Sequence, residues 1–186
     1  MVLALKSFLV NRYPDLKRGI FTVPKCPDLI FSATVFGVYT VIALLVGFLG
    51  GFFEFGILKT DIRFMLFLPI FLFFIPSVLE ELIFRGLLLP HKTRKLPKKH
   101  VLLYSIVSIL VFVGYHPLNG LTFARFAYPI FINPIFLILA TLMAIACTIT
   151  YLRSGSIWIP VCIHWLTVLV WILLLGGKNS VILLTS

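Results

Sequence analysis

Long apolar runs constrain the fold of this chain more than any other feature of its sequence. A helix of about 20 apolar residues crosses the roughly 30 Å hydrocarbon layer of a bilayer. Five runs approach or exceed that length: Leu29–Phe53, Phe64–Leu89, Val101–Pro117, Tyr128–Tyr151 and Ile157–Leu175. Only 12% of the residues are charged, against about 25% in a soluble domain. The sequence therefore predicts an all-α, polytopic transmembrane bundle of about five membrane helices, or six if Pro69 and Pro76 divide the second run.

The basic residues of the chain are concentrated in two segments. Five Lys and Arg residues lie in residues 1–28 and five more lie between Lys92 and Lys99, whereas the loops after the first and third runs hold two and one. Because basic loops remain on the cytoplasmic face of a membrane, both segments are predicted to be cytoplasmic. Residues 1–28 are interpreted as a cytoplasmic or interfacial segment that precedes a single membrane domain, residues 29–186. The formal net charge of +10 then indicates contact with anionic membrane lipids and not with nucleic acid.

Three of the apolar runs contain ionisable side chains, which are costly within a membrane. A charge at mid-bilayer costs at least about 2.5–3.5 kcal/mol, so such residues are candidates for a functional site. Glu81 and Arg85 are four residues apart on one helix face, which favours an ion pair that supports the site without reacting. Glu80 lies about 100° around the helix from Glu81, so one arginine is poorly placed to neutralise both acids. Glu80 is therefore the candidate general base.

Two histidines add to this set from other runs. At a rise of about 1.5 Å per residue, Glu80 and His164 lie about 15 Å and 16 Å from the same membrane face. His116 lies about 24 Å from it if its helix is straight and upright. The three titratable groups can therefore meet near the middle of the membrane.

These residues also occur in a recognisable order. Residues 80–85 match E-E-x-x-x-R, residues 112–116 match F-x-x-x-H, and His164 begins a third element. Together, over about residues 64–175, they resemble the CPBP family of intramembrane proteases, the CAAX protease and bacteriocin-processing family that is also called ABI. The resemblance implies a membrane-embedded endopeptidase in which Glu80 and His116 activate water and His164 donates to the oxyanion.

The third motif departs from the pattern of that family. The family usually has an asparagine four residues after the histidine, where it completes the oxyanion hole. Here that position is Val168, which cannot donate a hydrogen bond. Thr167 lies on roughly the same helix face and is a candidate substitute. Loss of one oxyanion donor costs about 10²–10³ in rate, so the departure bears directly on activity.

The resulting hypothesis is an intramembrane endopeptidase that hydrolyses a peptide bond of a membrane-associated substrate. We expect no cofactor, a water-filled cavity open to the cytoplasm, and a plasma membrane of bacterial type. The sequence itself gives no reason to expect a prenylated substrate. Two alternatives remain open. In a zinc-dependent protease, Glu80, His116 and His164 would be the ligands, although H-E-x-x-H spacing is missing. In a non-enzymatic membrane protein, the same polar cluster would serve a transport, immunity or scaffold role.

Overall fold

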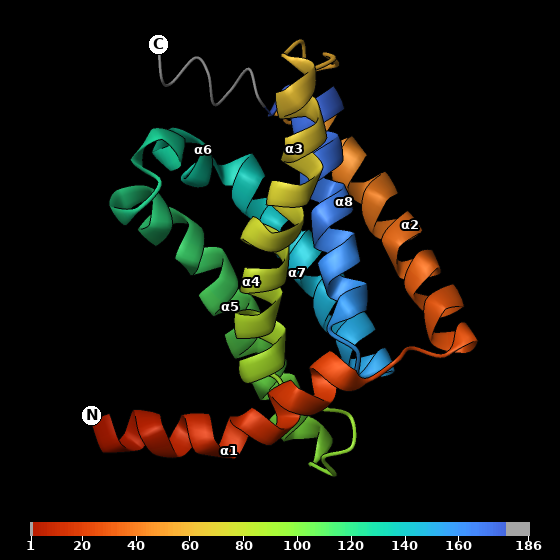
Figure 1. Cartoon of the computed structure of the whole chain (residues 1–186), viewed down its shortest axis with the longest axis vertical. Coiled ribbons are helices and arrows are strands. Elements are labelled where there is room, and N and C mark those ends of the chain that lie inside the picture. The colour runs from red at the N-terminus through yellow and green to blue at the C-terminus, as the bar shows by residue number, and fades with distance from the viewer. Residues whose placement is uncertain (1, 178–186) are drawn as a thin grey trace.

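The computed structural model describes residues 2–177, with side chains from residue 10 onward, and this part of the chain is almost wholly helical (Figure 1). The last nine residues of the predicted membrane domain, 178–186, lie outside the described residues. The main helices are α1 (Val2–Phe21), α2 (Cys26–Leu49), α3 (Ile62–Leu72), α4 (Leu79–Glu81), α5 (Lys98–Thr122), α6 (Tyr128–Phe131), α7 (Pro134–Ser154) and α8 (Trp158–Leu174).

The prediction of an all-α, polytopic bundle is confirmed. Within residues 2–177, four helical stretches are long and apolar enough to cross a membrane: α2, residues 62–87, α5 and α7. The fifth predicted span, α8, has 17 residues and so lies at the short end of the range for membrane helices. The chain is therefore an integral membrane protein by the length and composition of its helices.

The second span is kinked at Ile75. This residue has non-helical φ of −132° and ψ of 111°, because a residue before proline disfavours the helical region. Two helical pieces therefore meet within Phe73–Val78, and a π-helical segment, Leu82–Leu87, follows the single turn of α4. Residues 62–87 together still form one candidate membrane span, and no sixth span arises among residues 2–177.

Two boundaries differ from the sequence-based prediction. The third helix does not end at Pro117 but continues to Thr122, since membrane helices tolerate an internal proline. The fourth run is not one helix: α6 ends at Phe131 and α7 begins at Pro134. The side chain of Asn133 accepts hydrogen bonds from the amides of Ile135 (2.8 Å) and Phe136 (3.3 Å), and this N-cap starts a new helix.

The centre of the bundle is α7, which packs against α2, α5 and α8. Its inner face carries small residues such as Ala140, Ala144 and Cys147, which let membrane helices approach closely. Tyr39 of α2 and Phe112 of α5 belong to the same buried cluster. Because α5 and α8 both pack against α7, they lie beside the second span, whose buried polar residues face them.

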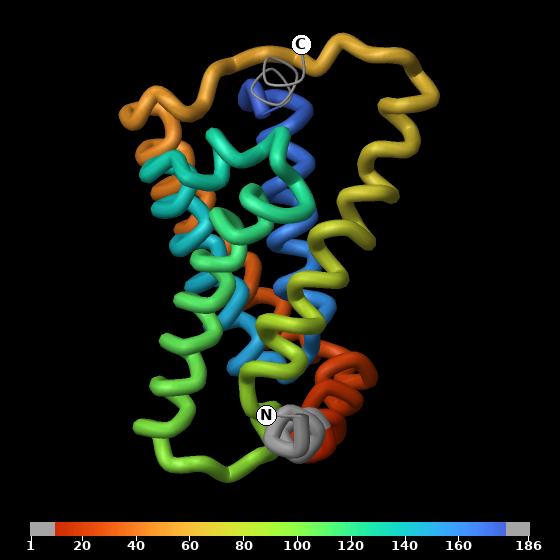
Figure 2. The backbone as a smooth tube through the Cα atoms, turned by 90° about the vertical axis from the view of Figure 1, so that its left-hand side faces the viewer, coloured from red at the N-terminus to blue at the C-terminus, as the bar shows by residue number. Residues whose placement is uncertain are grey.

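The N-terminal helix α1 lies across one end of the bundle (Figure 1). Asp15 accepts a hydrogen bond from Arg94 (2.9 Å), and the carbonyl of Gly19 accepts one from the amide of Ile157 (3.0 Å). Figure 2 shows α1 and the loop that follows the second span at this same end. The two basic segments thus share one end of the molecule, as a common cytoplasmic location requires. Which side of a membrane this end faces remains a prediction.

Candidate active site

The adjacent acids Glu80 and Glu81 lie in α4, between the kink at Ile75 and the π-helical segment Leu82–Leu87. Short π-helical insertions are frequent at functional sites. Just beyond α4, the hydroxyl of Ser108 on α5 donates to the carbonyl of Phe84 at 2.5 Å, so the second span is tied to α5 by a polar contact between helices. Both acids are buried, with exposed fractions of 7% for Glu80 and 0% for Glu81.

Glu81 is at the centre of a buried ionic network. Its Oε1 accepts hydrogen bonds from Nη1 of Arg85 at 3.0 Å and from Nδ1 of His164 at 2.9 Å. The ion pair with Arg85, predicted from the spacing, is present with both side chains fully buried. The bond to His164 was not anticipated by the sequence patterns, and it fixes the orientation of the imidazole ring.

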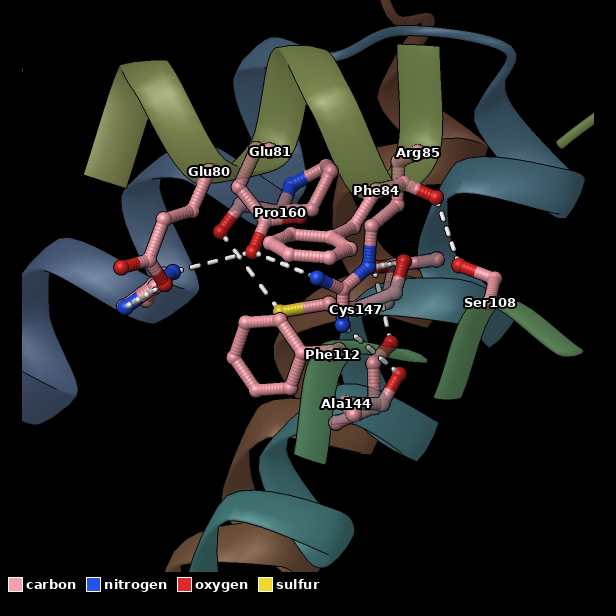
Figure 3. A network of polar contacts seen from close by, with 12 residues as sticks. Glu80, Glu81, Phe84, Arg85, Ser108, Phe112, Ala144, Cys147 and Pro160 are labelled. Atoms are coloured by element: carbon pink, nitrogen blue, oxygen red, sulfur yellow. Dashed lines mark hydrogen bonds and ion pairs between the residues drawn. The ribbon is translucent and has the colours of Figure 1, made fainter. Parts of the chain in front are cut away.

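Arg85 has two further partners that hold it in place (Figure 3). Its Nη2 donates to the carbonyl of Ala144 on α7 at 3.2 Å, and its guanidinium carbon lies 4.6 Å from the centre of the Phe112 ring. Such cation–π contacts are worth up to about 2 kcal/mol when desolvated. Arg85 therefore joins the second span to α5 and α7 and faces away from solvent.

Glu80 points to a different partner. Its Oε2 lies 3.8 Å from Nε2 of His164, which is too far for a direct hydrogen bond. That same oxygen is buried and has no hydrogen-bond partner within the described part of the chain. Glu80 and Glu81 thus address opposite nitrogens of one imidazole ring, and only Glu81 bonds to it directly.

His116 enters the site from α5. Its Nδ1 lies 2.9 Å from the backbone carbonyl of Phe112. A carbonyl oxygen can only accept, so Nδ1 carries the hydrogen and Nε2 of the neutral ring has a free lone pair. The ring is bounded by Phe131 and Phe136, with ring centres 5.3 Å and 5.2 Å away. An imidazole held in this way can accept a proton or a hydrogen bond through Nε2.

All three predicted catalytic residues line one cavity of about 380 Å³. The structure therefore brings Glu80, His116 and His164 together, as the depth argument predicted. The other lining groups come mainly from apolar and aromatic side chains, among them Phe71 and Phe136.

The cavity lies toward one end of the bundle. Its walls come from the later parts of α2, α5 and α8, from α6 and from the early part of α7, which lie toward the end of the bundle away from α1 (Figure 1). The expectation that the cavity opens to the cytoplasm stays a prediction.

Comparison with known proteins assigns the chain to a family. Residues 61–170, more than half of the chain, match the family described as Type II CAAX prenyl endopeptidase Rce1-like. The chain belongs to this family. No curated protein and no solved structure matches it. The matched region contains all of the residues that carry the predicted resemblance, and the Rce1-like family is one of CAAX-type membrane proteases. The resemblance inferred from the motifs is thus confirmed.

This Rce1-like protein departs from the usual pattern at Val168, and the structure shows what surrounds that position. Val168 and Thr167 both line the cavity. The hydroxyl of Thr167, however, donates to the carbonyl of Ile163 at 2.8 Å. Its one hydrogen is therefore engaged within α8, which weakens the prediction that Thr167 replaces the missing donor.

The site also contains groups that the motifs did not indicate. Tyr39 of α2 lies outside the matched region, yet it lines the cavity and is buried. No sequence signal distinguished it from the other aromatic residues of an apolar helix. Among the described residues, no group of three or more His, Cys, Asp or Glu side chains is arranged to hold a metal ion. The expectation of no cofactor stays a prediction.

Proposed function

We propose that this Rce1-like protein is an intramembrane endopeptidase in which Glu80 is the general base. The observation that carries the proposal is that one cavity is lined by the buried side chain of Glu80 and by the side chains of His116 and His164, whereas Glu81 is not among its lining residues. A base must reach the proton that it removes, directly or through water. Glu80 meets this condition because its side chain lines the space in which a peptide bond would lie.

The reaction begins with a water molecule between Glu80 and Nε2 of His116. The water oxygen attacks the scissile carbonyl carbon while its proton passes to the Glu80 carboxylate. The carbonyl π electrons move to oxygen and form a tetrahedral oxyanion. When the oxyanion collapses, the C–N bond breaks and Glu80 returns the proton to the leaving amine. The products are a carboxylic acid and an amine, and Glu80 is regenerated.

His164 is the proposed donor to the oxyanion, and Glu81 is the residue that positions it. Because a carboxylate can only accept, Nδ1 carries the hydrogen of the 2.9 Å bond to Glu81. Donation through Nε2 then requires a doubly protonated ring. The geometry supports this role, because His164 lines the cavity and its Nε2 lies on the Glu80 side of the ring, 3.8 Å from Oε2 of Glu80.

For the substrate, we propose a membrane-associated peptide with a prenylated CAAX terminus, because the matched family is described by that activity. The apolar and aromatic walls of the cavity are suited to a lipid-modified peptide. For the location, we propose a plasma membrane of bacterial type with the α1 end in the cytoplasm, because both basic segments lie at that end.

The test is peptide cleavage by the purified protein in detergent. A prenylated CAAX peptide and its unprenylated counterpart are compared, with products identified by mass spectrometry. Glu80→Gln is the inactive variant, and Glu54→Gln is the matched control, since Glu54 is an exposed acid in the loop after α2. We expect cleavage by the wild type and by Glu54→Gln and none by folded Glu80→Gln. Equal rates for Glu80→Gln and wild type, or no cleavage by either, would reject the proposal.

A further inference from the structure

A second hollow of the molecule, distinct from the catalytic cavity, is a groove between α5 and α7. Its volume is about 420 Å³, within the range of roughly 300–1,000 Å³ that is usual for ligand pockets. Its lining residues recur at helical spacing on one face of each helix, among them Val101, Ser105 and Ile109 on α5 and Ile145, Ile149 and Leu152 on α7. In the part of the chain that the structure describes, the groove and the catalytic cavity share no lining residue.

The groove has a buried floor and apolar rims. Two small side chains that line it, Ser105 and Thr148, have exposed fractions of only 9% and 3%. Leu102 and Ile149, which also line it, are exposed to 61% and 42%. The hydroxyl of Ser105 donates to the carbonyl of Val101 at 2.8 Å, so this polar group is satisfied within its own helix. The groove is therefore suited to a hydrocarbon chain that enters from the side of the bundle.

The length of the groove matches one leaflet of a bilayer. From Lys98 to Ile109 its lining extends along α5 for about 16 Å at a rise of about 1.5 Å per residue. Half of the roughly 30 Å hydrocarbon layer is about 15 Å. Since α5 is a candidate membrane span and Lys98 is its first residue, Lys98 lies at the level of the lipid headgroups.

The charge at this end of the groove favours an anionic headgroup. Lys98 is exposed, and it takes part in none of the ion pairs of the described residues. All six acidic residues of the chain lie at or before Glu81, so α5 and α7 carry no carboxylate that neutralises it. Lys95 and Lys99 add further positive charge to the same segment. Basic residues beside a membrane span attract anionic lipids.

We propose that this groove binds one anionic phospholipid of the leaflet at the α1 end, with an acyl chain between α5 and α7 and the phosphate group at Lys98. Binding here does not depend on the proposed endopeptidase function. Because such a lipid contacts the folded protein only, it stabilises the fold in proportion to its affinity. It also links α5, the helix that carries His116, to the centre of the bundle.

The test is lipid binding by the purified, delipidated protein in an uncharged detergent. Phosphatidylglycerol and phosphatidylcholine with identical acyl chains are titrated separately, with the melting temperature and native mass spectrometry as readouts. We expect one phosphatidylglycerol to bind per chain, to raise the melting temperature and to bind more tightly than phosphatidylcholine. Lys98→Gln should weaken phosphatidylglycerol binding about fivefold, the effect of one basic residue near an anionic lipid surface. Lys99→Gln is the charge-matched control, because Lys99 does not line the groove, and it should change the affinity less.

A second pair of variants fills the groove. Ile149→Trp should abolish the binding of the single phosphatidylglycerol, whereas Ile138→Trp should keep it, because Ile138 is a similarly exposed isoleucine of the same helix that does not line the groove. Retained binding by a folded Ile149→Trp protein would overturn the inference. If Ile149→Trp changes the oligomeric state and wild type binds no phosphatidylglycerol, the groove is an interface between chains and the inference is again overturned.

The lysine variants decide the matter even if Ile149→Trp does not fold. Equal affinities for the two lipids, or equal losses in Lys98→Gln and Lys99→Gln, would reduce the effect to general surface charge and overturn the inference. These results leave the endopeptidase untouched, since that proposal stands or falls with cleavage by wild type and by Glu80→Gln.

Discussion

Neutralising members of the buried ionic network one at a time and then together tests whether Glu80 and Glu81 have different roles. Glu81 and Arg85 are both fully buried and joined at 3.0 Å. Leaving one charge of a buried pair without its partner typically costs about 3–5 kcal/mol of stability. Glu81→Gln and Arg85→Gln should therefore both destabilise the protein in detergent.

The structure predicts that Glu81→Gln destabilises the protein more than Arg85→Gln does. Glu81 accepts hydrogen bonds from both Arg85 and His164, so Glu81→Gln leaves two donors without their carboxylate. Its loss of unfolding free energy should be about 5 kcal/mol, the upper end of that range. After Arg85→Gln, Glu81 keeps its hydrogen bond from His164, and the loss should be about 3 kcal/mol. The double variant leaves neither charge unpaired and should be more stable than Glu81→Gln alone.

Glu80→Gln should behave in the opposite way. Its buried Oε2 has no hydrogen-bond partner in the described part of the chain, so neutralising Glu80 should maintain or raise stability while abolishing cleavage. Unfolding by SDS in mixed micelles gives the free energies, and peptide cleavage gives the rates. Normal cleavage by Glu80→Gln beside a folded but inactive Glu81→Gln would show that the base is Glu81.

Four further measurements follow from the site and from the end covered by α1. Cleavage should survive strong chelators, because the described residues offer no cluster of metal ligands; loss with EDTA or phenanthroline, reversed by Zn²⁺, would favour the zinc-dependent alternative. His164→Ala should nearly abolish cleavage in a folded protein, and an active variant would remove His164 from the mechanism. A single cysteine placed at Lys95 in a cysteine-free background should be labelled only from the cytoplasmic side, and external labelling would reverse the topology. Burial lowers the pKa of His91 below its ordinary value of 6.5, despite opposing effects of the Gly155 backbone and of Asp15, while Arg18 and Lys92 lower it further. Protonation then costs the folded state more than the unfolded state, so stability should fall as the pH drops below about 6.5. His91→Asn should flatten this dependence, and an unchanged pH profile would contradict it.

Apolar length, the depth of each residue in its helix and the order of the motifs were enough to predict the bundle and to indicate that Glu80, His116 and His164 can lie together. The boundaries of the helices were harder to predict than their existence, because a boundary depends on local hydrogen bonds at the helix end. Asn133 followed by Pro134 is a typical helix start, and reading that pair would have divided the fourth run correctly. In contrast, Pro117 suggested an end that the membrane helix does not have.

The parts of the site that escaped prediction all depend on contacts between distant helices. The bond between His164 and Glu81 joins residues 83 positions apart, and the contact of Arg85 with the Ala144 carbonyl joins residues 59 apart. No spacing rule within one helix can indicate such pairs, since they follow from how α7 and α8 pack against the second span. The position of Tyr39 in the cavity wall could not be predicted for the same reason, because in the sequence it is one aromatic residue among others in an apolar helix.

Two independent properties of the molecule together limit how a substrate can reach Glu80. The distribution of Lys and Arg predicts that the α1 end is cytoplasmic, while the residues that line the cavity lie toward the opposite end. If the predicted orientation holds, we expect the peptide to approach Glu80 from the outer half of the membrane or laterally from the bilayer, because the lining residues lie away from α1. A membrane-impermeant peptide offered to sealed vesicles of defined orientation distinguishes these routes. Cleavage only from the α1 side would require that α1 moves away from the bundle during the reaction.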